Sequence, residues 1–117
     1  MKFKTGDVVV GRPSWWLYDT QNQVIAWAGD MFTSLDEAQD AADDFRFGAS
    51  WARFELYRDR TDQWRWRALR DGRKIASSTM TYSSELDARR AANLVKTAVA
   101  HAVPASARPL ALRRTAD

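Results

Sequence analysis

The sequence lacks several residue types and segments on which common classes of function depend. It has no cysteine, which excludes disulfides and thiol chemistry and mildly favours a cytoplasmic location. Histidine occurs once, at His101, and the five glycines are scattered, so no glycine-rich phosphate loop is present. No run approaches the roughly 20 apolar residues of a membrane-spanning helix. The first residues also lack the apolar segment of a signal peptide, so we expect a cytoplasmic protein with no membrane partner.

These absences also argue against an enzyme. The single histidine has no cysteine to assist it, and the sequence identifies no base for the serines at positions 77, 78, 83 and 84. The acidic residues between positions 36 and 44 are typical of a solvated helix face rather than of a metal cage. We therefore predict no enzymatic activity, no catalytic residues, no metal site and no cofactor.

Aromatic residues are abundant. The 117 residues include six tryptophans, five phenylalanines and three tyrosines. A chain of this length buries roughly two-thirds of its unfolded surface when it folds, enough for one stable core. We therefore expect residues 1–117 to form a single domain with an aromatic core.

Charge is divided unevenly along the chain. Residues 1–50 carry four basic and eight acidic side chains, whereas residues 51–117 carry 14 basic and seven acidic ones. Two interpretations are open: complementary pieces packed together in one fold, or a basic surface for an anionic partner. We favour the first, because a dedicated nucleic-acid module usually carries a larger positive excess than the total of +3 found here.

The two halves resemble each other at a constant spacing of 50 residues. The aligned positions without a gap are Trp16 with Trp66, Ile25-Ala26 with Ile75-Ala76, Ser34 with Ser84, Ala38 with Ala88, and Ala41-Ala42 with Ala91-Ala92. Self-similarity at a fixed period is the signature of a repeat. Two copies are too few for a solenoid, so the sequence predicts one pseudo-symmetric domain with internal repeats at about 1–50 and 51–117.

Periodicity predicts strands and a helix in each half. In the second half, alternation predicts strands over 52–58, 63–70 and 74–80, and a helix begins after Ser84, with Asp87 at the capping-box position. A short strand over 110–114 is also expected. The first half predicts strands over 3–10, 15–19 and 24–30 and a helix over 35–47. The apolar residues expected on the inner helix faces are Leu35, Ala38, Ala41, Ala42 and Phe45 in the first half, and Leu86, Ala91, Leu94, Val95 and Ala98 in the second.

The stretch from Phe54 to Lys96, FELYRDRTDQWRWRALRDGRKIASSTMTYSSELDARRAANLVK, resembles the YegP-like family of small uncharacterised bacterial and archaeal proteins. Its motif is an F-E-L-Y strand, a W-R-W-R-like strand, an I-A-S-S strand, a Y-S-S helix start and a closing V-K. The first half is similar to a degenerate copy. The resemblance implies an α+β fold: two tandem repeats of three strands, a helix and a strand, forming one mostly antiparallel sheet with exchanged terminal strands and two helices on one face. It implies no established activity and no catalytic residues.

The sidedness of the segment 63–70 decides what the chain can bind. Neighbouring residues of a strand point to opposite faces of the sheet, so Trp64 and Trp66 share one face and Arg65 and Arg67 share the other. Burial of a large apolar side chain is favourable and burial of an unpaired arginine is costly. We therefore expect the tryptophans to lie beneath the helices and the arginines to lie on the open face of the sheet.

The residues expected on this open face are Arg53, Glu55, Tyr57, Arg65 and Arg67. One interpretation is a solvated face in which Glu55 pairs with Arg65 or Arg67. The function that we predict is a non-enzymatic binding or interaction module that uses this face, with a protein, including a second copy of the chain, as a possible partner. Nucleic-acid binding through the basic second half is the alternative. Alternation disfavours it by separating rings from cations, although Tyr57 and Trp15 could still point outward.

Overall fold

The computed structural model describes residues 1–105, in which six strands and two helices follow one another in a simple order. The elements are β1 (Lys2–Val9), β2 (Arg12–Tyr18), β3 (Val24–Trp27), α1 (Leu35–Gly48), β4 (Arg53–Arg58), β5 (Trp64–Arg70), β6 (Arg73–Ser78) and α2 (Glu85–Ala98), with short 3₁₀ turns η1 (Ala49–Trp51) and η2 (Val99–His101) after the helices. The strand predicted over 110–114 lies outside the described residues. No helix within residues 1–105 is long and apolar enough to cross a bilayer.

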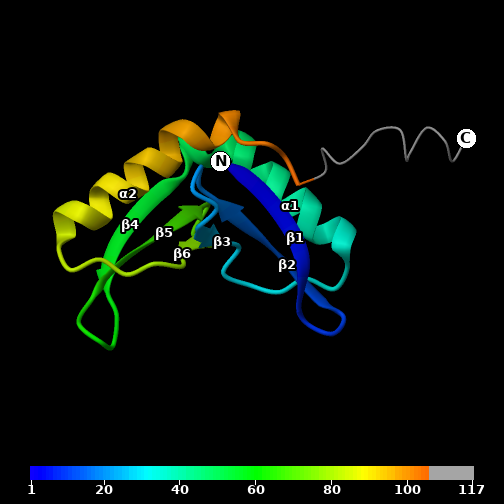
Figure 1. Ribbon diagram of the computed structural model, residues 1–117, viewed down its shortest axis with the longest axis horizontal. Coiled ribbons are helices and arrows are strands. Elements are labelled where there is room, and N and C mark those ends of the chain that lie inside the picture. The colour runs from blue at the N-terminus through cyan, green and yellow to red at the C-terminus, as the bar shows by residue number, and fades with distance from the viewer. Residues whose placement is uncertain (106–117) are drawn as a thin grey trace, which may run out of the picture.

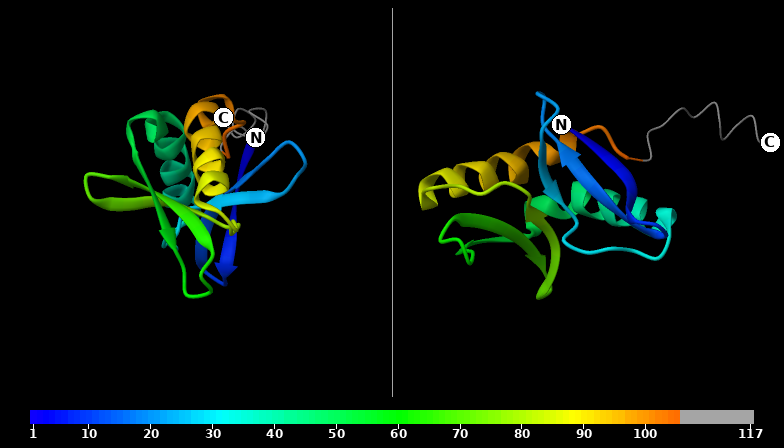
Figure 2. Two further views of the ribbon diagram at one scale, coloured as in Figure 1. Left: turned by 90° about the vertical axis from the view of Figure 1, so that its left-hand side faces the viewer. Right: turned by 60° about the horizontal axis from the view of Figure 1, so that its bottom comes forward.

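The six strands form one sheet with the order β1-β2-β3-β6-β5-β4, and each neighbouring pair is antiparallel. Both helices lie on the same side of the sheet, with α1 against β1 and β2 and α2 against β4 and β5 (Figure 1). The views in Figure 2 show the strands spread beneath the two helices. The α+β fold predicted from the sequence is confirmed: one antiparallel sheet is covered by two helices on one face.

The two halves contribute the same elements in the same order. Helix α2 begins and ends 50 residues after α1, and η2 follows it just as η1 follows α1. Each helix begins at a serine, Ser34 or Ser84, whose hydroxyl accepts a hydrogen bond from the amide three residues later, as in a side-chain N-cap. That this correspondence reflects a tandem repeat remains a prediction.

The ends of the two halves are less alike than the resemblance implies. The resemblance implies a strand after each helix. After α2 and η2, however, Val103 makes only a single parallel bridge, with Lys2 at the outer edge of β1. The amide of Phe3 donates to the carbonyl of Val103, and the amide of Val103 donates to the carbonyl of Met1. Val103 is therefore held at the edge of the first half.

The tryptophans do not follow the 50-residue spacing. Leu17 pairs with Ala26 and Ala68 pairs with Ala76, and in both cases the sheet register shifts directly after this pair. The two alanines are 50 residues apart, but their partners Leu17 and Ala68 are 51 residues apart. Trp15 lies two residues before Leu17 and Trp66 two residues before Ala68, so these two tryptophans occupy equivalent places in the sheet. Both are fully buried. The alignment of Trp16 with Trp66 is thus wrong by one residue, and the option left open for Trp15, that it points outward, is excluded by its burial.

The inner faces of the helices differ from the predicted ones. Helix α1 buries Ala38, Ala42 and Phe45 as expected, whereas Leu35 is exposed. On α2 the buried residues are Ala88, Ala92 and Val95, and the two leucines expected there, Leu86 and Leu94, are 54% and 57% exposed. Ala88, Ala92 and Val95 follow the i, i+4, i+7 spacing of one helix face, and the two leucines lie off that face.

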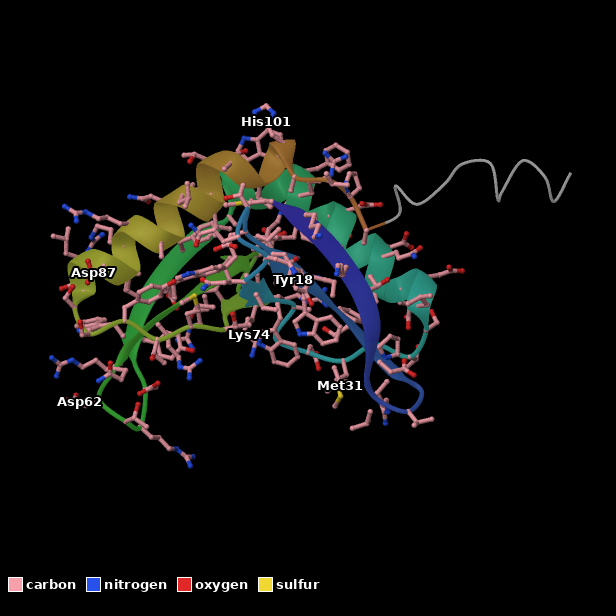
Figure 3. The ribbon with its side chains drawn as sticks, in the orientation of Figure 1. Tyr18, Met31, Asp62, Lys74, Asp87 and His101 are labelled. Carbon is pink, nitrogen blue, oxygen red and sulfur yellow. The ribbon has the colours of Figure 1, made fainter. Side chains whose placement is uncertain are left out.

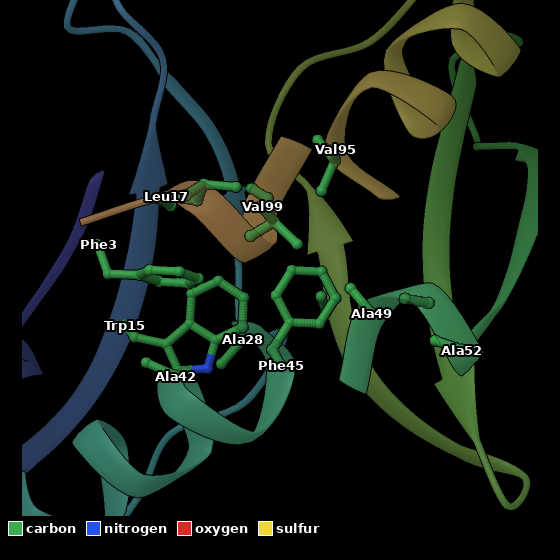
Figure 4. Packing of buried hydrophobic residues seen from close by; sticks show 14 of the residues in the cluster. Phe3, Trp15, Leu17, Ala28, Ala42, Phe45, Ala49, Ala52, Val95 and Val99 are labelled. Carbon is green, nitrogen blue, oxygen red and sulfur yellow. The ribbon is translucent and has the colours of Figure 1, made fainter. Parts of the chain in front are cut away.

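A continuous chain of aromatic rings forms the core. Phe3, Trp15, Phe45, Phe54 and Trp66 follow one another with ring centroids between 5.3 and 6.5 Å apart. Trp15 and Phe45 are stacked, which joins β2 directly to α1, and Figure 4 shows this contact with Phe3 on its far side. The chain of rings connects the two halves of the sheet, and it commits one face of the sheet to the core.

Candidate binding surface on the open sheet face

The face of the sheet that the helices leave uncovered carries the arginines of β5, as the sequence predicts. Trp66 and Ala68 are fully buried on the helix side. On the other side, the side chains of Arg65 and Arg67 are 33% and 43% exposed. Trp64 is only half-buried, because it lies near the end of the strand, where the guanidinium of Arg58 covers its ring at 5.2 Å. The predicted sidedness of β5 is confirmed.

Four of the predicted site residues lie together. Glu55 and Arg67 are direct partners across β4 and β5, and the Arg67 Nε donates to the Glu55 Oε1 over 3.0 Å. Arg53 forms an ion pair with the second oxygen of the same carboxylate at 2.8 Å. The guanidinium of Arg67 also lies over the ring of Tyr57, 4.7 Å from its centroid. One carboxylate therefore holds two arginines, and one of these covers the neighbouring aromatic ring.

Arg65, the fifth predicted residue, pairs with Asp59 rather than with Glu55. Its Nε donates to the Asp59 Oδ2 at 2.7 Å. The other oxygen of Asp59 accepts hydrogen bonds from the amides of Thr61 and Gln63 and from the Thr61 hydroxyl, which closes the turn between β4 and β5. The Arg65 contact, followed by the hydrogen bonds from Thr61 and Gln63, holds the pKa of Asp59 well below its ordinary value. Arg65 is thus fixed by the turn that precedes its own strand.

A row of directly paired residues crosses the whole open face, one from each strand. In sheet order the row is Lys4, Trp16, Trp27, Ser77, Arg67 and Glu55. Within it, Trp16 and Trp27 are half-buried neighbours on β2 and β3. The ring of Trp16 lies beside Gly6 on β1, 3.9 Å from where a Cβ would be. Two tryptophans therefore lie side by side on the face that the helices leave open.

Aromatic rings and cations consequently share this face. The expectation that alternation places them on opposite faces is therefore wrong for the sheet as a whole. Tyr18 lies on the same face as Trp16, two residues along β2, and the ammonium of Lys4 lies 4.8 Å from its ring centroid. Strict alternation separates rings from cations only within β5. Between strands the sheet brings them together, because each strand presents its own set of alternate residues. The sequence contained the signal in the alternation of β2, but only the register of that strand shows which residues point outward.

One further exposed aromatic residue lies at the margin of the open face. Trp51, in η1, is 78% exposed, and with Arg53 and Leu69 it lines a shallow hollow of about 380 Å³ at the end of β4. Large exposed aromatic residues are enriched at binding hot spots. Trp51 belongs to no strand or helix periodicity, so the sequence carries no signal for its role.

The remaining groups with catalytic potential have structural roles or stand alone. His101 points outward at the end of η2, away from the rest of the protein (Figure 3). Ser78 is buried and its hydroxyl accepts a hydrogen bond from the amide of Trp66, and Ser84 caps α2. No group of three or more histidine, cysteine or acidic residues within residues 1–105 is arranged to hold a metal ion.

The arrangement of strands and helices is similar to that of two solved structures. The solution NMR structure of YegP from E. coli, a protein of unknown function, superposes with a TM-score of 0.72 over 87% of this chain and 88% of that one, at 13% sequence identity. The chain has the YegP fold. The solution NMR structure of the UPF0339 protein SO3888 from Shewanella oneidensis shares it, with a TM-score of 0.70 over 85% and 84% of the two chains, also at 13% identity.

The YegP fold agrees with the resemblance that the motifs of the second half indicate. No protein-family model matches the chain, and no curated protein matches its sequence. At 13% identity the similarity to the two structures concerns the fold alone. The function of this chain with the YegP fold therefore has to be argued from its own side chains.

Proposed function

We propose that the protein is a non-enzymatic binding module of the cytoplasm and that the open face of its sheet is the binding surface. The observation that supports this most directly is the row from Lys4 to Glu55, which crosses all six strands and includes the neighbouring rings of Trp16 and Trp27. Half-buried indoles on a face that no described helix covers are typical of interaction surfaces.

The charged residues of this face favour selective recognition of a partner over non-specific electrostatic attraction. Arg65 and Arg67 are held by Asp59 and Glu55, so their guanidinium groups are fixed in position and partly neutralised. A partner would meet ordered arginines beside ordered rings, which lowers the entropic cost of binding. The proposal that the protein is no enzyme rests on its isolated histidine and on the structural roles of its buried and capping serines.

Capture of partners from the native cell with paired variants tests the proposal. Trp16→Ala with Trp27→Ala removes two rings from the open face, and Leu86→Ala with Leu94→Ala removes two exposed apolar side chains from α2 as the matched control. We expect the first variant to lose the protein or nucleic acid that the wild type captures and the second to keep it, since hot spots are dominated by aromatic anchors. Equal capture by the wild type and both variants, or no specific capture at all, contradicts the proposal.

Single-stranded nucleic acid is the second candidate ligand. The specific observation in its favour is that Trp16, Trp27 and Lys4 are neighbours in one row, since bases stack on rings while phosphates pair with cations. The pairing of Arg65 and Arg67 with carboxylates weighs against it, because those cations are less available to phosphates.

A salt titration of binding to labelled single-stranded DNA and RNA tests this candidate. Binding through several phosphates falls steeply as salt rises. Arg65→Glu with Arg67→Glu adds negative charge beside the rings and is expected to weaken such binding, whereas the charge-matched control, Arg89→Glu with Arg90→Glu on α2, is expected to leave most of it. An affinity that does not depend on salt, or that the two double variants reduce equally, rejects the open face as a nucleic-acid site.

A further inference from the structure

A second candidate site lies on the helix side of the sheet and is independent of the open face. A groove of about 680 Å³ separates α1 from the hairpin that joins β5 to β6. Its lining comes from α1, from the segment after β3 and from both strands of the hairpin. Its volume lies within the range of about 300–1,000 Å³ that is usual for small-molecule sites.

One wall of the groove is acidic. Glu37, Asp40 and Asp44 line it from α1, and their spacing of three and four residues places them along one side of the helix. Interaction with the helix dipole explains acidic residues only in the first turn, so it does not account for Asp40 and Asp44. Hydrogen bonds from Thr33 lower the pKa of Glu37, which favours the charged form of that carboxyl group.

The opposite wall is basic. It is formed by Arg70 and Arg73, which are direct partners across the β5–β6 hairpin. Asp71, in the turn between the two arginines, also lines the groove, so the pair contributes two positive charges beside one negative charge. The Arg70 guanidinium reaches α1, where it occupies the space that a side chain at Gly48 would fill. Lys74 lies at the outer rim and points away from the helices (Figure 3).

The floor between the two walls is apolar. The half-buried side chains of Phe32, Ala41 and Ile75 line it, together with the buried ring of Phe45. Apolar contact area with a few polar groups at its margins is the usual composition of a ligand site. The floor therefore offers a place for an apolar group between the two charged walls.

None of the ion pairs formed by residues 1–105 joins the acidic wall to the basic one. The acidic wall is also not arranged to hold a metal ion. We infer that the groove binds a zwitterionic small molecule of the size of a short peptide. Its amine pairs with Asp40 and Asp44, its carboxylate pairs with Arg70 and Arg73, and its apolar side chains lie on the floor.

Calorimetric titration with the dipeptide Leu-Leu and two blocked forms tests this inference. Acetylation removes the positive charge of the amine, and amidation removes the negative charge of the carboxylate. We expect the free dipeptide to bind and each blocked form to bind at least about tenfold more weakly, because one charge-assisted contact is lost in each. Absence of binding by the free dipeptide, or equal affinity for all three forms, overturns the inference.

Variants assign the binding to the groove. Asp40→Asn with Asp44→Asn and, separately, Arg70→Gln with Arg73→Gln are each expected to weaken binding of the free dipeptide roughly tenfold or more. The control is Asp87→Asn, at the position of α2 that is 50 residues after Glu37 and outside the groove lining. Thermal unfolding shows whether each variant is folded. If a variant does not fold, the blocked dipeptides still test both walls on the wild-type protein. Binding that neither double variant weakens places the ligand elsewhere and contradicts the assignment.

Discussion

At the scale of single residues, a shift of one position decides which tryptophans are buried and which are on the open face. Trp15 and Trp16 are adjacent, yet the first stacks on Phe45 in the core and the second lies beside Trp27 on the open face. Sequence alternation predicts that the two residues differ but not which one is buried, because that depends on where β2 begins and how it pairs. For β5 the choice was predictable, because two tryptophans alternate with two arginines.

Substitution of tryptophans in different environments tests the assigned burial. Trp66→Ala is expected to lower the free energy of unfolding by about 3–5 kcal/mol, since it leaves a cavity in a close-packed core. Trp51→Ala, at a site that is 78% exposed, is expected to change it by no more than about 0.5 kcal/mol. Denaturant titration measures both, and a similar loss for the two variants would show that Trp66 is not a core residue.

Trp66→Phe is expected to cost much less than Trp66→Ala. No residue within 1–105 accepts a hydrogen bond from the buried indole N–H of Trp66, so phenylalanine removes a donor without an acceptor there while it keeps most of the apolar volume. The same denaturant titration compares the two variants. If Trp66→Phe lowered the free energy of unfolding as much as Trp66→Ala, the indole N–H would contribute to stability, which contradicts the prediction.

The pairing of Asp59 with Arg65 predicts a dependence of stability on pH. Because the pKa of Asp59 is lower in the folded protein than its ordinary value of 3.8, its carboxylate stabilises the fold above that pH, and this contribution is lost as the pH falls further. Asp59→Asn is therefore expected to lower the free energy of unfolding at neutral pH and to flatten its decline below about pH 4.

The control for Asp59 is Asp62→Asn in the same turn. Asp62 pairs with Arg58 on the surface, and both side chains are largely exposed, so little stability depends on that contact. Its positive φ of 65° is also one that asparagine tolerates. Unfolding measured from pH 2 to 7 should separate the two variants, and parallel curves for Asp59→Asn and the wild type would rule out the predicted linkage.

At the scale of elements, the helix starts were predictable and the helix faces only partly so. A serine followed three residues later by an acidic residue marks both N-termini, and this signal is local. The buried face depends on what lies opposite. On α2 the buried stripe is Ala88, Ala92 and Val95, and the leucines expected to face inward are exposed, because how the helix is rotated against the sheet is not set by its own periodicity.

The caps predict a matched loss of stability in both halves. Ser34→Ala and Ser84→Ala are each expected to lower the free energy of unfolding by about 1 kcal/mol, because an amide of the first turn loses its acceptor. Ser83→Ala, at the exposed position directly before the second cap, serves as the control. Thermal or denaturant unfolding measures the difference, and a control that costs as much as the caps would show that the hydroxyl contacts contribute nothing specific.

At the scale of the whole molecule, the fold divides the sheet into a face that packs against the helices and a face that the described helices leave uncovered. The aromatic chain from Phe3 to Trp66 joins both halves on the helix side. The row from Lys4 to Glu55 crosses the same six strands on the other side. The α+β class, the helices on one face and the outward arginines of β5 followed from the sequence. The row did not, because it depends on the pairing of β3 with β6, two strands far apart in the chain.

Hydroxyl-radical footprinting of the protein, free and bound to the partner that it captures, tests most directly whether the open face is the binding surface. Oxidation of Trp16 and Trp27 is expected to fall in the complex, while oxidation of Leu86 and Leu94 on α2 is expected to remain unchanged. Unchanged oxidation of the two tryptophans, with protection on α2 instead, would contradict the account and place the binding surface on the helices.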